Sequence, residues 1–102
     1  MKAYRFSEEA DLEFQGQIDY FAEHAPGVGE RFIADVDAAV RDIRAHPEIG
    51  SPVTKLIRKR VLRVFKYSIL YINDLDEIVI VAVAPHKRRP GYWRKRLREL
   101  RR

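Results

Sequence analysis

The chain contains no cysteine, and only one methionine and one tryptophan occur among its 102 residues. The absence of cysteine excludes disulfide bonds, thiolate nucleophiles and metal sites built on thiolates. Three histidines are present, His24, His46 and His86, but they lie far apart and lack the spacing of metal ligands. We therefore predict neither a metal site nor a cofactor.

Long apolar runs are absent as well. No stretch of 18 apolar residues occurs, and the first residues do not have the pattern of a signal peptide. These absences predict a cytoplasmic protein with no membrane partner. Apolar residues nevertheless make up 46% of the chain, which argues against disorder, and the length suits one compact domain that spans residues 1–102.

The net charge of +5 conceals a division along the chain. Residues 1–49 contain five Lys or Arg and eleven Asp or Glu, a net charge of −6, whereas residues 50–102 contain fifteen and four, a net charge of +11. The basic residues gather in two clusters, 55–66 and 87–102. Such a surface attracts polyanions or an acidic protein segment, although a solvated basic face without a partner is the alternative.

Two stretches of the chain have helical periodicity. Ser7 is suited to cap a helix that runs to about His24, because its hydroxyl can accept from a free N–H of the first turn and acidic residues follow it. After a turn at 26–27, a second helix is expected to end at the His-Pro pair 46–47. The apolar positions at helical spacing are Ala10, Phe14, Ile18, Phe21 and Ala25 in the first stretch, and Val28, Phe32, Val36, Ala39, Val40 and Ile43 in the second. We expect an antiparallel helical hairpin.

Four stretches that are rich in alternating, β-branched or aromatic residues predict strands, namely 2–6, 60–65, 67–73 and 78–84. An Asn/Asp-rich turn at 73–76 joins the last two strands as a hairpin. The predicted order is βααβββ. This order indicates an α+β fold in which the helical hairpin packs on one face of a mainly antiparallel sheet, followed by a short C-terminal helix.

We expect function in the stretch 76–93. Its first half, 78–84, is apolar at every position, which indicates a central strand buried on both faces. Pro85 ends this strand because it has no N–H to donate, and cations and aromatic rings follow it. Because two helices cover only one face of a sheet, we expect part of the other apolar face to stay open to a partner. A helix that begins near Pro90 is expected to cover the rest with Trp93, Leu97 and Leu100.

Three features of the chain occur together in a known group of proteins. They are the order βααβββ, the hairpin made by Tyr67-Ser68-Ile69-Leu70-Tyr71 and the strand 78–84, and the run His86-Lys87-Arg88-Arg89-Pro90-Gly91-Tyr92-Trp93-Arg94. In these features the chain resembles the RelE/ParE superfamily of small bacterial toxins, and in the last of them its ParE branch. The resemblance implies the toxin of a type II toxin–antitoxin pair, of the kind that stabilises plasmids and inhibits growth. It also implies a cognate antitoxin as partner, in a toxin–antitoxin heterodimer or a dimer of heterodimers.

The ParE branch inhibits DNA gyrase, and this is the function that the resemblance implies for the chain. Binding then replaces catalysis, and Arg and aromatic residues dominate the energies of interfaces. The candidates for target binding are therefore Arg88, Arg89, Tyr92, Trp93 and Arg94. For Trp93, the alternative is an anchor of the tail in the core. The candidates for antitoxin binding, on the open apolar face and its basic rim, are Arg60, Val79, Val81 and Val83.

The RelE branch instead cleaves mRNA in the ribosome without a metal, which is the second hypothesis. Such cleavage needs a base that activates the ribose 2′-OH, an acid for the leaving oxygen and cations near the phosphate. His86 or Tyr92 can serve as acid and base, with Arg63 and Arg88 on the phosphate; for Arg63, a solvated strand residue is the alternative. A third hypothesis is a nucleic-acid-binding module without toxic action, which requires tight, salt-dependent binding to DNA or RNA.

Overall fold

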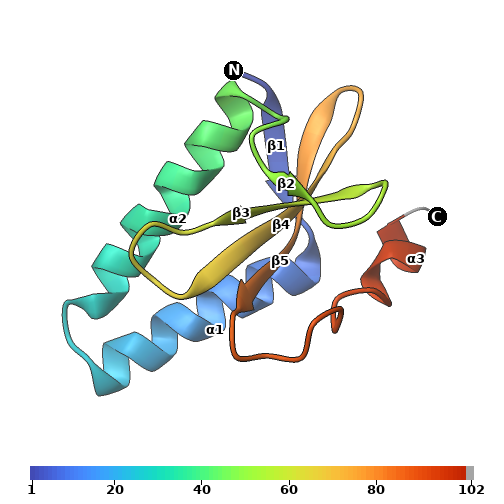
Figure 1. The fold of residues 1–102 in the computed structure, drawn as a ribbon. Helices are drawn as coiled ribbons and strands as arrows, with labels where there is room; N and C mark the ends of the chain where they lie inside the picture. Colours follow the sequence, from blue (N-terminus) through green and yellow to red (C-terminus); the bar gives the residue numbers. More distant parts are fainter. Residues whose placement is uncertain (101–102) are drawn as a thin grey trace.

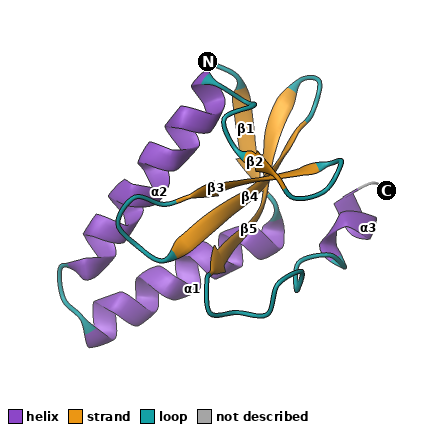
Figure 2. Cartoon of the chain, viewed as in Figure 1, coloured by secondary structure: helices purple, strands orange, loops and turns teal. Residues whose placement is uncertain are grey.

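A five-stranded sheet forms the centre of the molecule, with two long helices on one side and the C-terminal segment, residues 86–100, on the other (Figure 1, Figure 2). The structure, a computed structural model, describes residues 1–100. In chain order the elements are β1 (Ala3–Phe6), α1 (Glu8–His24), α2 (Val28–Ala45), β2 (Ser51–Pro52), β3 (Ile57–Val61), β4 (Tyr67–Asn73), β5 (Glu77–Pro85) and α3 (Arg96–Leu100). The prediction of an α+β fold with a helical hairpin is confirmed.

Both long helices begin where the sequence predicts. The Ser7 hydroxyl accepts a hydrogen bond from Ala10 N at 3.2 Å, which satisfies one free N–H in the first turn of α1. Gly27 precedes α2 with φ at 86°, a left-handed conformation that glycine adopts without a steric cost. The apolar stripes of α1 and α2 then pack on the same face of the sheet, in one cluster with Phe32 and Ile80.

β5 lies inside the sheet although it is the last strand in the sequence. The strand order is β1-β5-β4-β3-β2, in which β1 runs parallel to β5 and the other neighbours are antiparallel. Every residue of β5 from Ile78 to Val83 is buried. The prediction of a central strand that is buried on both faces is confirmed.

One strand was predicted at the wrong place. β3 occupies Ile57–Val61, whereas the sequence predicted a strand over 60–65, and the residues after Val61 form the turn to β4. The Asp35 carboxylate of α2 explains the difference, because it accepts hydrogen bonds from the backbone N–H groups of Val64 and Phe65 at 3.0 and 2.9 Å. These N–H groups are therefore satisfied by a helix instead of a neighbouring strand. The edge strand β2, which pairs with β3, was not predicted.

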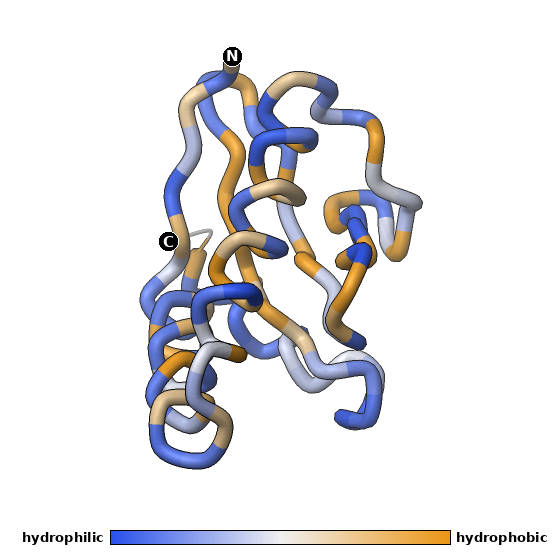
Figure 3. Tube along the Cα trace, turned by 90° about the vertical axis from the view of Figure 1, so that its left-hand side faces the viewer, coloured by the Kyte–Doolittle hydropathy of each residue, from blue (hydrophilic) through white to orange (hydrophobic). Residues whose placement is uncertain are grey.

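Apolar side chains pack on both faces of the sheet. In Figure 3 the apolar stretches, drawn in orange, run through the strands, whereas the helices alternate between orange and blue. The face opposite the helices buries Ile57, Leu70, Ile72, Val79, Val81, Ala82 and Trp93, with Leu97 and Leu100 packed against them. The expectation was that part of this face stays open. The C-terminal segment covers the apolar cluster, and the part that stays open is a groove beside it that includes Val53 and Val61.

A bulge in β5 determines which valines face which side. The pairing of β4 and β5 shifts by one residue at Val81, which has no opposite residue in β4. Val79 and Val81 consequently face the C-terminal segment, whereas Val83 faces the helices. The three valines predicted to bind an antitoxin therefore do not share a face, and their exposed fractions are only 4%, 0% and 2%. The C-terminal segment covers Val79 and Val81, and the helices cover Val83.

The C-terminal helix is shorter than predicted. α3 spans Arg96–Leu100, and residues 90–95 form turns where the sequence predicted helix. Gly91 adopts φ at 80° within this stretch, a conformation that interrupts a right-handed helix. Trp93 and the apolar residues of α3 nevertheless pack on the sheet together, as predicted.

Two kinds of feature are missing from residues 1–100. Each helix in this part of the chain is too short or insufficiently apolar to cross a bilayer. Within the same residues, His, Asp and Glu side chains do not gather in groups of three or more that could bind a metal ion. Residues 101–102, which contribute to the charge of the C-terminal half, lie outside the described residues.

Gly50 is tightly enclosed in the loop before β2. A Cβ atom at this position would lie 2.7 Å from the Tyr71 hydroxyl oxygen and 3.0 Å from the Lys59 carbonyl oxygen. The buried Tyr71 hydroxyl cannot move away freely, because it donates to Pro47 O at 2.7 Å and accepts from Gly50 N at 2.9 Å. This pair of hydrogen bonds connects the loop to the core.

We expect Gly50→Ala to lower the free energy of unfolding by about 1–3 kcal/mol, because the new methyl group displaces a buried ring and its hydrogen bonds. Gly16→Ala is the matched control, since a Cβ in the middle of α1 meets nothing within 4 Å. This control should be neutral or stabilising by up to about 1 kcal/mol, because alanine favours helix. Urea denaturation measures both variants. Equal stability of the two would contradict the role given to the Tyr71 hydroxyl.

Candidate functional site

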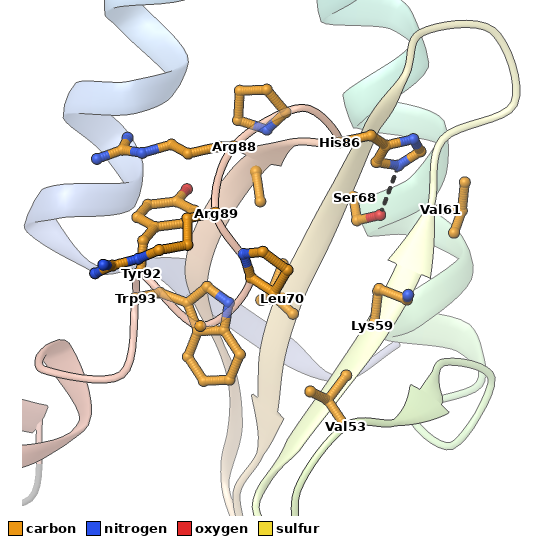
Figure 4. Close-up of a pocket in the computed structure, with 14 residues that line it drawn as sticks. Val53, Lys59, Val61, Ser68, Leu70, His86, Arg88, Arg89, Tyr92 and Trp93 are labelled. Atoms are coloured by element: carbon orange, nitrogen blue, oxygen red, sulfur yellow. Dashed lines mark hydrogen bonds between the residues drawn. The ribbon is translucent and has the colours of Figure 1, made fainter.

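An open groove lies between the chain that follows β5 and the sheet face opposite the helices (Figure 4). Its volume is about 330 Å³. Residues 86–95, of which five are Lys or Arg, form one side and are called the basic segment below. The groove is lined by Val53, Lys59, Val61, Ser68, Leu70, Ala84, Pro85, His86, Arg88, Arg89, Pro90, Gly91, Tyr92 and Trp93. An apolar floor is thus bordered by cationic side chains.

The basic segment consists of turns, so a few anchors determine its position. At its start, His86 N donates to Lys66 O at 3.0 Å, which ties the segment to the turn before β4. In its middle, Gly91 reverses the direction of the chain with its positive φ. Near its end, Trp93 is 5% exposed and lies in the apolar cluster under the segment.

His86 lies at one end of the groove, where its imidazole is exposed. Its Nε2 is 2.9 Å from the Oγ of Ser68, a buried residue of β4 (dashed line in Figure 4). Which of the two groups donates this hydrogen bond depends on the tautomer of the ring. Lys59 of β3 lines the same groove. This end of the groove can therefore bind an anionic group.

Glu13 of α1 connects the basic segment to the body of the protein. Its Oε2 accepts from the Tyr92 hydroxyl at 2.5 Å and from Arg96 Nη2 at 3.0 Å, and its Oε1 accepts from Arg96 Nη1 at 2.8 Å. The same Oε1 accepts from the backbone N–H of Val83 at 3.1 Å, and Arg88 Nη1 lies 3.6 Å from Oε2. The side chains of Glu13 and Arg96 are each 15% exposed, so this bidentate ion pair is largely shielded from water.

Tyr92 forms part of the groove wall, with its hydroxyl directed at Glu13. Burial, and after it the hydrogen bond to Glu13, raises the pKa of Tyr92 well above its ordinary value, so the phenol stays protonated at neutral pH. The guanidinium carbons of Arg88 and Arg96 lie 3.8 and 5.1 Å from the centroid of the ring, within the range of cation–π interactions. The hydroxyl is therefore already engaged by Glu13.

Arg63 lies apart from the groove. Its side chain is 75% exposed, and its Nη2 is 3.7 Å from Asp42 Oδ2 on α2. Arg60, a candidate for antitoxin binding, donates to the same oxygen at 3.1 Å. Both arginines therefore lie on the helix side of the sheet. The structure brings the other three candidate nuclease residues to the groove but leaves Arg63 out.

The five candidates for target binding differ in exposure. Arg88, Arg89 and Arg94 are exposed, and the guanidinium carbon of Arg94 lies 5.5 Å from the centroid of the Trp93 ring. Tyr92 is half-buried. The burial of Trp93 favours the alternative reading of this residue, as an anchor in the core. The surface available to a target is mainly the arginines.

Glu13 and Arg96 were not predicted from the sequence. A signal for Glu13 exists, because it follows the buried Ala10 by three residues and therefore flanks the apolar stripe of α1. An acid in this position lies close to the sheet and needs a partner. The identity of that partner could not be inferred, since 83 residues separate Glu13 from Arg96.

Comparisons with known proteins agree on one group. A family model described as "ParE toxin of type II toxin-antitoxin system, parDE" matches residues 4–90. The fold is similar to a solved structure titled "Chromosomal ParDE TA system from P. aeruginosa", with a TM-score of 0.71 and 15% sequence identity. This alignment covers 83% of the present chain and 96% of the other, and at such identity it concerns the fold alone. No curated protein matches the chain.

We expect Trp93→Ala to lower the free energy of unfolding by about 3 kcal/mol or more, because it removes a buried ring from the apolar cluster under the basic segment. Leu75→Ala is a suitable control, since Leu75 is 93% exposed in the turn between β4 and β5. The control should change stability by no more than about 0.5 kcal/mol. Denaturant unfolding followed by circular dichroism measures both. A Trp93 variant as stable as the control would mean that the segment is not anchored by this ring.

Proposed function

The chain belongs to the family of ParE toxins of type II toxin–antitoxin systems, and on this premise we propose that it inhibits growth by binding DNA gyrase and not by cleaving RNA. The observation that carries this proposal is the geometry of the candidate nuclease residues. Tyr92 and Arg88 are engaged by Glu13, Arg63 lies near Asp42 on the helix side of the sheet, and His86 is left in the groove.

An RNA-cleaving site needs an acid, a base and cations around one phosphate. The Tyr92 hydroxyl donates to Glu13, and Arg88 lies against the Tyr92 ring and the same carboxylate. Arg63 lies near Asp42 on the helix side of the sheet. His86 is the one member of the proposed set whose ring is exposed at the groove without an ionic partner among the described residues. A single imidazole does not make up such a site, which supports binding over catalysis.

The groove suits a protein target. Its floor includes the exposed Val53 and Val61, and its rim includes Arg88 and Arg89. Exposed apolar side chains that are bordered by arginines are typical of protein interfaces, in which desolvated Arg contributes much of the affinity. We propose that a surface of gyrase with acidic and apolar residues contacts Arg89 and Arg94 and the apolar floor.

The second candidate function is ribosome-dependent cleavage of mRNA, and His86 is the observation that favours it. The imidazole lies in a groove that also carries Lys59 and Arg89. These cations can hold a phosphate near the ring. A reactive set would then have to be completed on the ribosome.

For the antitoxin, we propose that it occupies the groove. The valines inferred from the sequence are buried, and Arg60 is paired with Asp42. A segment that carries both acidic and apolar side chains would match the cationic rim and the apolar floor. Such a complex would be a heterodimer or a dimer of heterodimers. Because both gyrase and the ribosome are cytoplasmic, we propose the same location for this protein.

Parallel assays of the purified protein separate the two candidate functions. We expect inhibition of gyrase supercoiling and intact mRNA in a translating extract. His86→Ala should retain inhibition of supercoiling within about twofold, because an exposed imidazole at the end of the groove adds little to an arginine-based interface. Codon-phased mRNA cuts that disappear in His86→Ala, together with unaffected supercoiling, would replace gyrase by the ribosome as target.

The arginines of the basic segment can be tested by their effect on affinity and on stability. We expect Arg89→Ala combined with Arg94→Ala to raise the half-inhibitory concentration for gyrase about tenfold or more, since exposed arginines at an interface carry binding energy. The unfolding free energy should change by no more than about 0.5 kcal/mol per site.

The charge-matched control is Arg31→Ala combined with Arg41→Ala, two exposed positions on α2. It lowers the net charge by the same amount on the other side of the sheet. An equal loss of inhibition in both double variants would show that total charge, and not the basic segment, determines binding.

A further inference from the structure

We infer that Glu13, a residue of α1, positions the basic segment for its protein target, a role that presupposes the proposed function. Glu13 is not itself a contact residue. Its side chain is only 15% exposed, and both carboxylate oxygens are engaged within the protein. It acts through the residues that it holds.

The contacts of Glu13 reach the basic segment at several points. Arg88 lies near its start and Tyr92 near its end, while Arg96 comes immediately after it, and all three lie against the one carboxylate. Arg96 Nη1 in addition donates to Val81 O at 3.1 Å, which ties the same guanidinium to β5. Because the segment has no helix or strand of its own, these side-chain contacts restrict the paths that it can follow.

The apolar anchor alone does not determine that path. Trp93 is held by burial, which is non-directional and does not by itself specify the course of the backbone on either side of the ring. The hydrogen bonds to Glu13 depend on both distance and angle, and the Arg96 pair is bidentate. Trp93 therefore keeps the segment on the sheet, and Glu13 determines its orientation there.

Glu13 also divides the arginines into two groups. Arg88 and Arg96 are drawn toward the carboxylate, and both lie against the Tyr92 ring. Arg89 and Arg94 are exposed, and neither makes an ion pair with an acid among residues 1–100. The first pair supports the wall of the groove, and the second pair is left for the target. Loss of Glu13 would release the first pair and alter how the second is presented.

The chain carries its own reporters of this arrangement. Trp93 is the only tryptophan, so its fluorescence reports on the basic segment alone. Trypsin cleaves after Arg88 and Arg94 within the segment, and after Arg31 and Arg41 in α2, which provides an internal reference. Neither measurement needs gyrase or an antitoxin.

The test compares the full-length Glu13→Ala variant with Glu23→Ala, which removes an exposed acid from the same helix. For Glu13→Ala we expect a red-shifted emission of Trp93 and about tenfold faster cleavage after Arg88 and Arg94, because the segment opens locally. Cleavage in α2 should stay unchanged. The half-inhibitory concentration for gyrase should rise about tenfold, and growth arrest in cells should weaken. Glu23→Ala should match the unsubstituted protein in Trp93 emission, tryptic cleavage, gyrase inhibition and growth arrest.

Several results would overturn the inference. Unchanged Trp93 emission and unchanged cleavage in Glu13→Ala would mean that Glu13 does not hold the segment. A displaced segment with undiminished growth arrest would mean that its orientation has no functional role. Equally accelerated cleavage in α2 would indicate general destabilisation. If Glu13→Ala does not fold, Glu13→Gln and Tyr92→Phe are measured in the same way, and behaviour like that of the original chain in both would overturn the inference.

Failure of the proposed function is distinguishable from failure of this inference. If the original chain arrests growth without inhibiting gyrase, the proposed target is wrong. The Trp93 emission, the cleavage pattern and the growth arrest of the Glu13 variants then still decide whether Glu13 positions the segment.

Discussion

The structure depends on one constraint, which is that β5 is apolar on both faces. Each valine or isoleucine that it buries stabilises the fold by about 1.5–3 kcal/mol relative to an exposed side chain, so neither face can be left in water without a large loss. The helices formed by the first half of the chain cover one face. After Pro85 the chain must therefore return across the other face, and Trp93 and the apolar residues of α3 cover it. Because β5 is apolar on both faces, the basic segment is held against the sheet.

A second constraint follows from the short length of β1. β1 pairs with β5 only as far as Ile80, so the next backbone groups of β5 have no strand partner on that side. The Val81 carbonyl instead accepts from Ser7 Oγ at 3.4 Å and from Arg96 Nη1 at 3.1 Å, and the Val83 N–H donates to Glu13. Buried backbone groups need such partners. Beyond the end of β1, the Glu13–Arg96 pair therefore satisfies the free backbone groups of β5. The same carboxylate and guanidinium also hold the basic segment.

The two halves of the chain carry opposite charge and form different parts of the structure. The acidic half of the chain forms the helices, and the basic half forms the groove and its rim. Glu13 joins the two halves through an ion pair with Arg96 that is largely shielded from water, and breaking a shielded pair costs more than breaking one at the surface because one charge is left without a partner. Arg89 and Arg94, which do not contact Glu13, are exposed to water, where they contribute little to stability and are available to a partner. Apolar floors bordered by exposed arginines are common in interfaces with other macromolecules.

The sequence by itself determined the two long helices, the cap at Ser7 and the central strand that is buried on both faces, because periodicity and capping are local properties of neighbouring residues. It also carried the family resemblance, through the hairpin and the basic, aromatic run after β5. Only the tertiary structure decided the rest. Asp35, which lies 29 residues before Val64, determines where the turn before β4 begins. The bulge at Val81 determines which side chains of β5 face the helices and which face the C-terminal segment. The contact between Glu13 and Arg96 spans 83 residues. These contacts depend on which surfaces meet when the chain folds. A local sequence pattern contains no information about charges that become neighbours only in the folded chain.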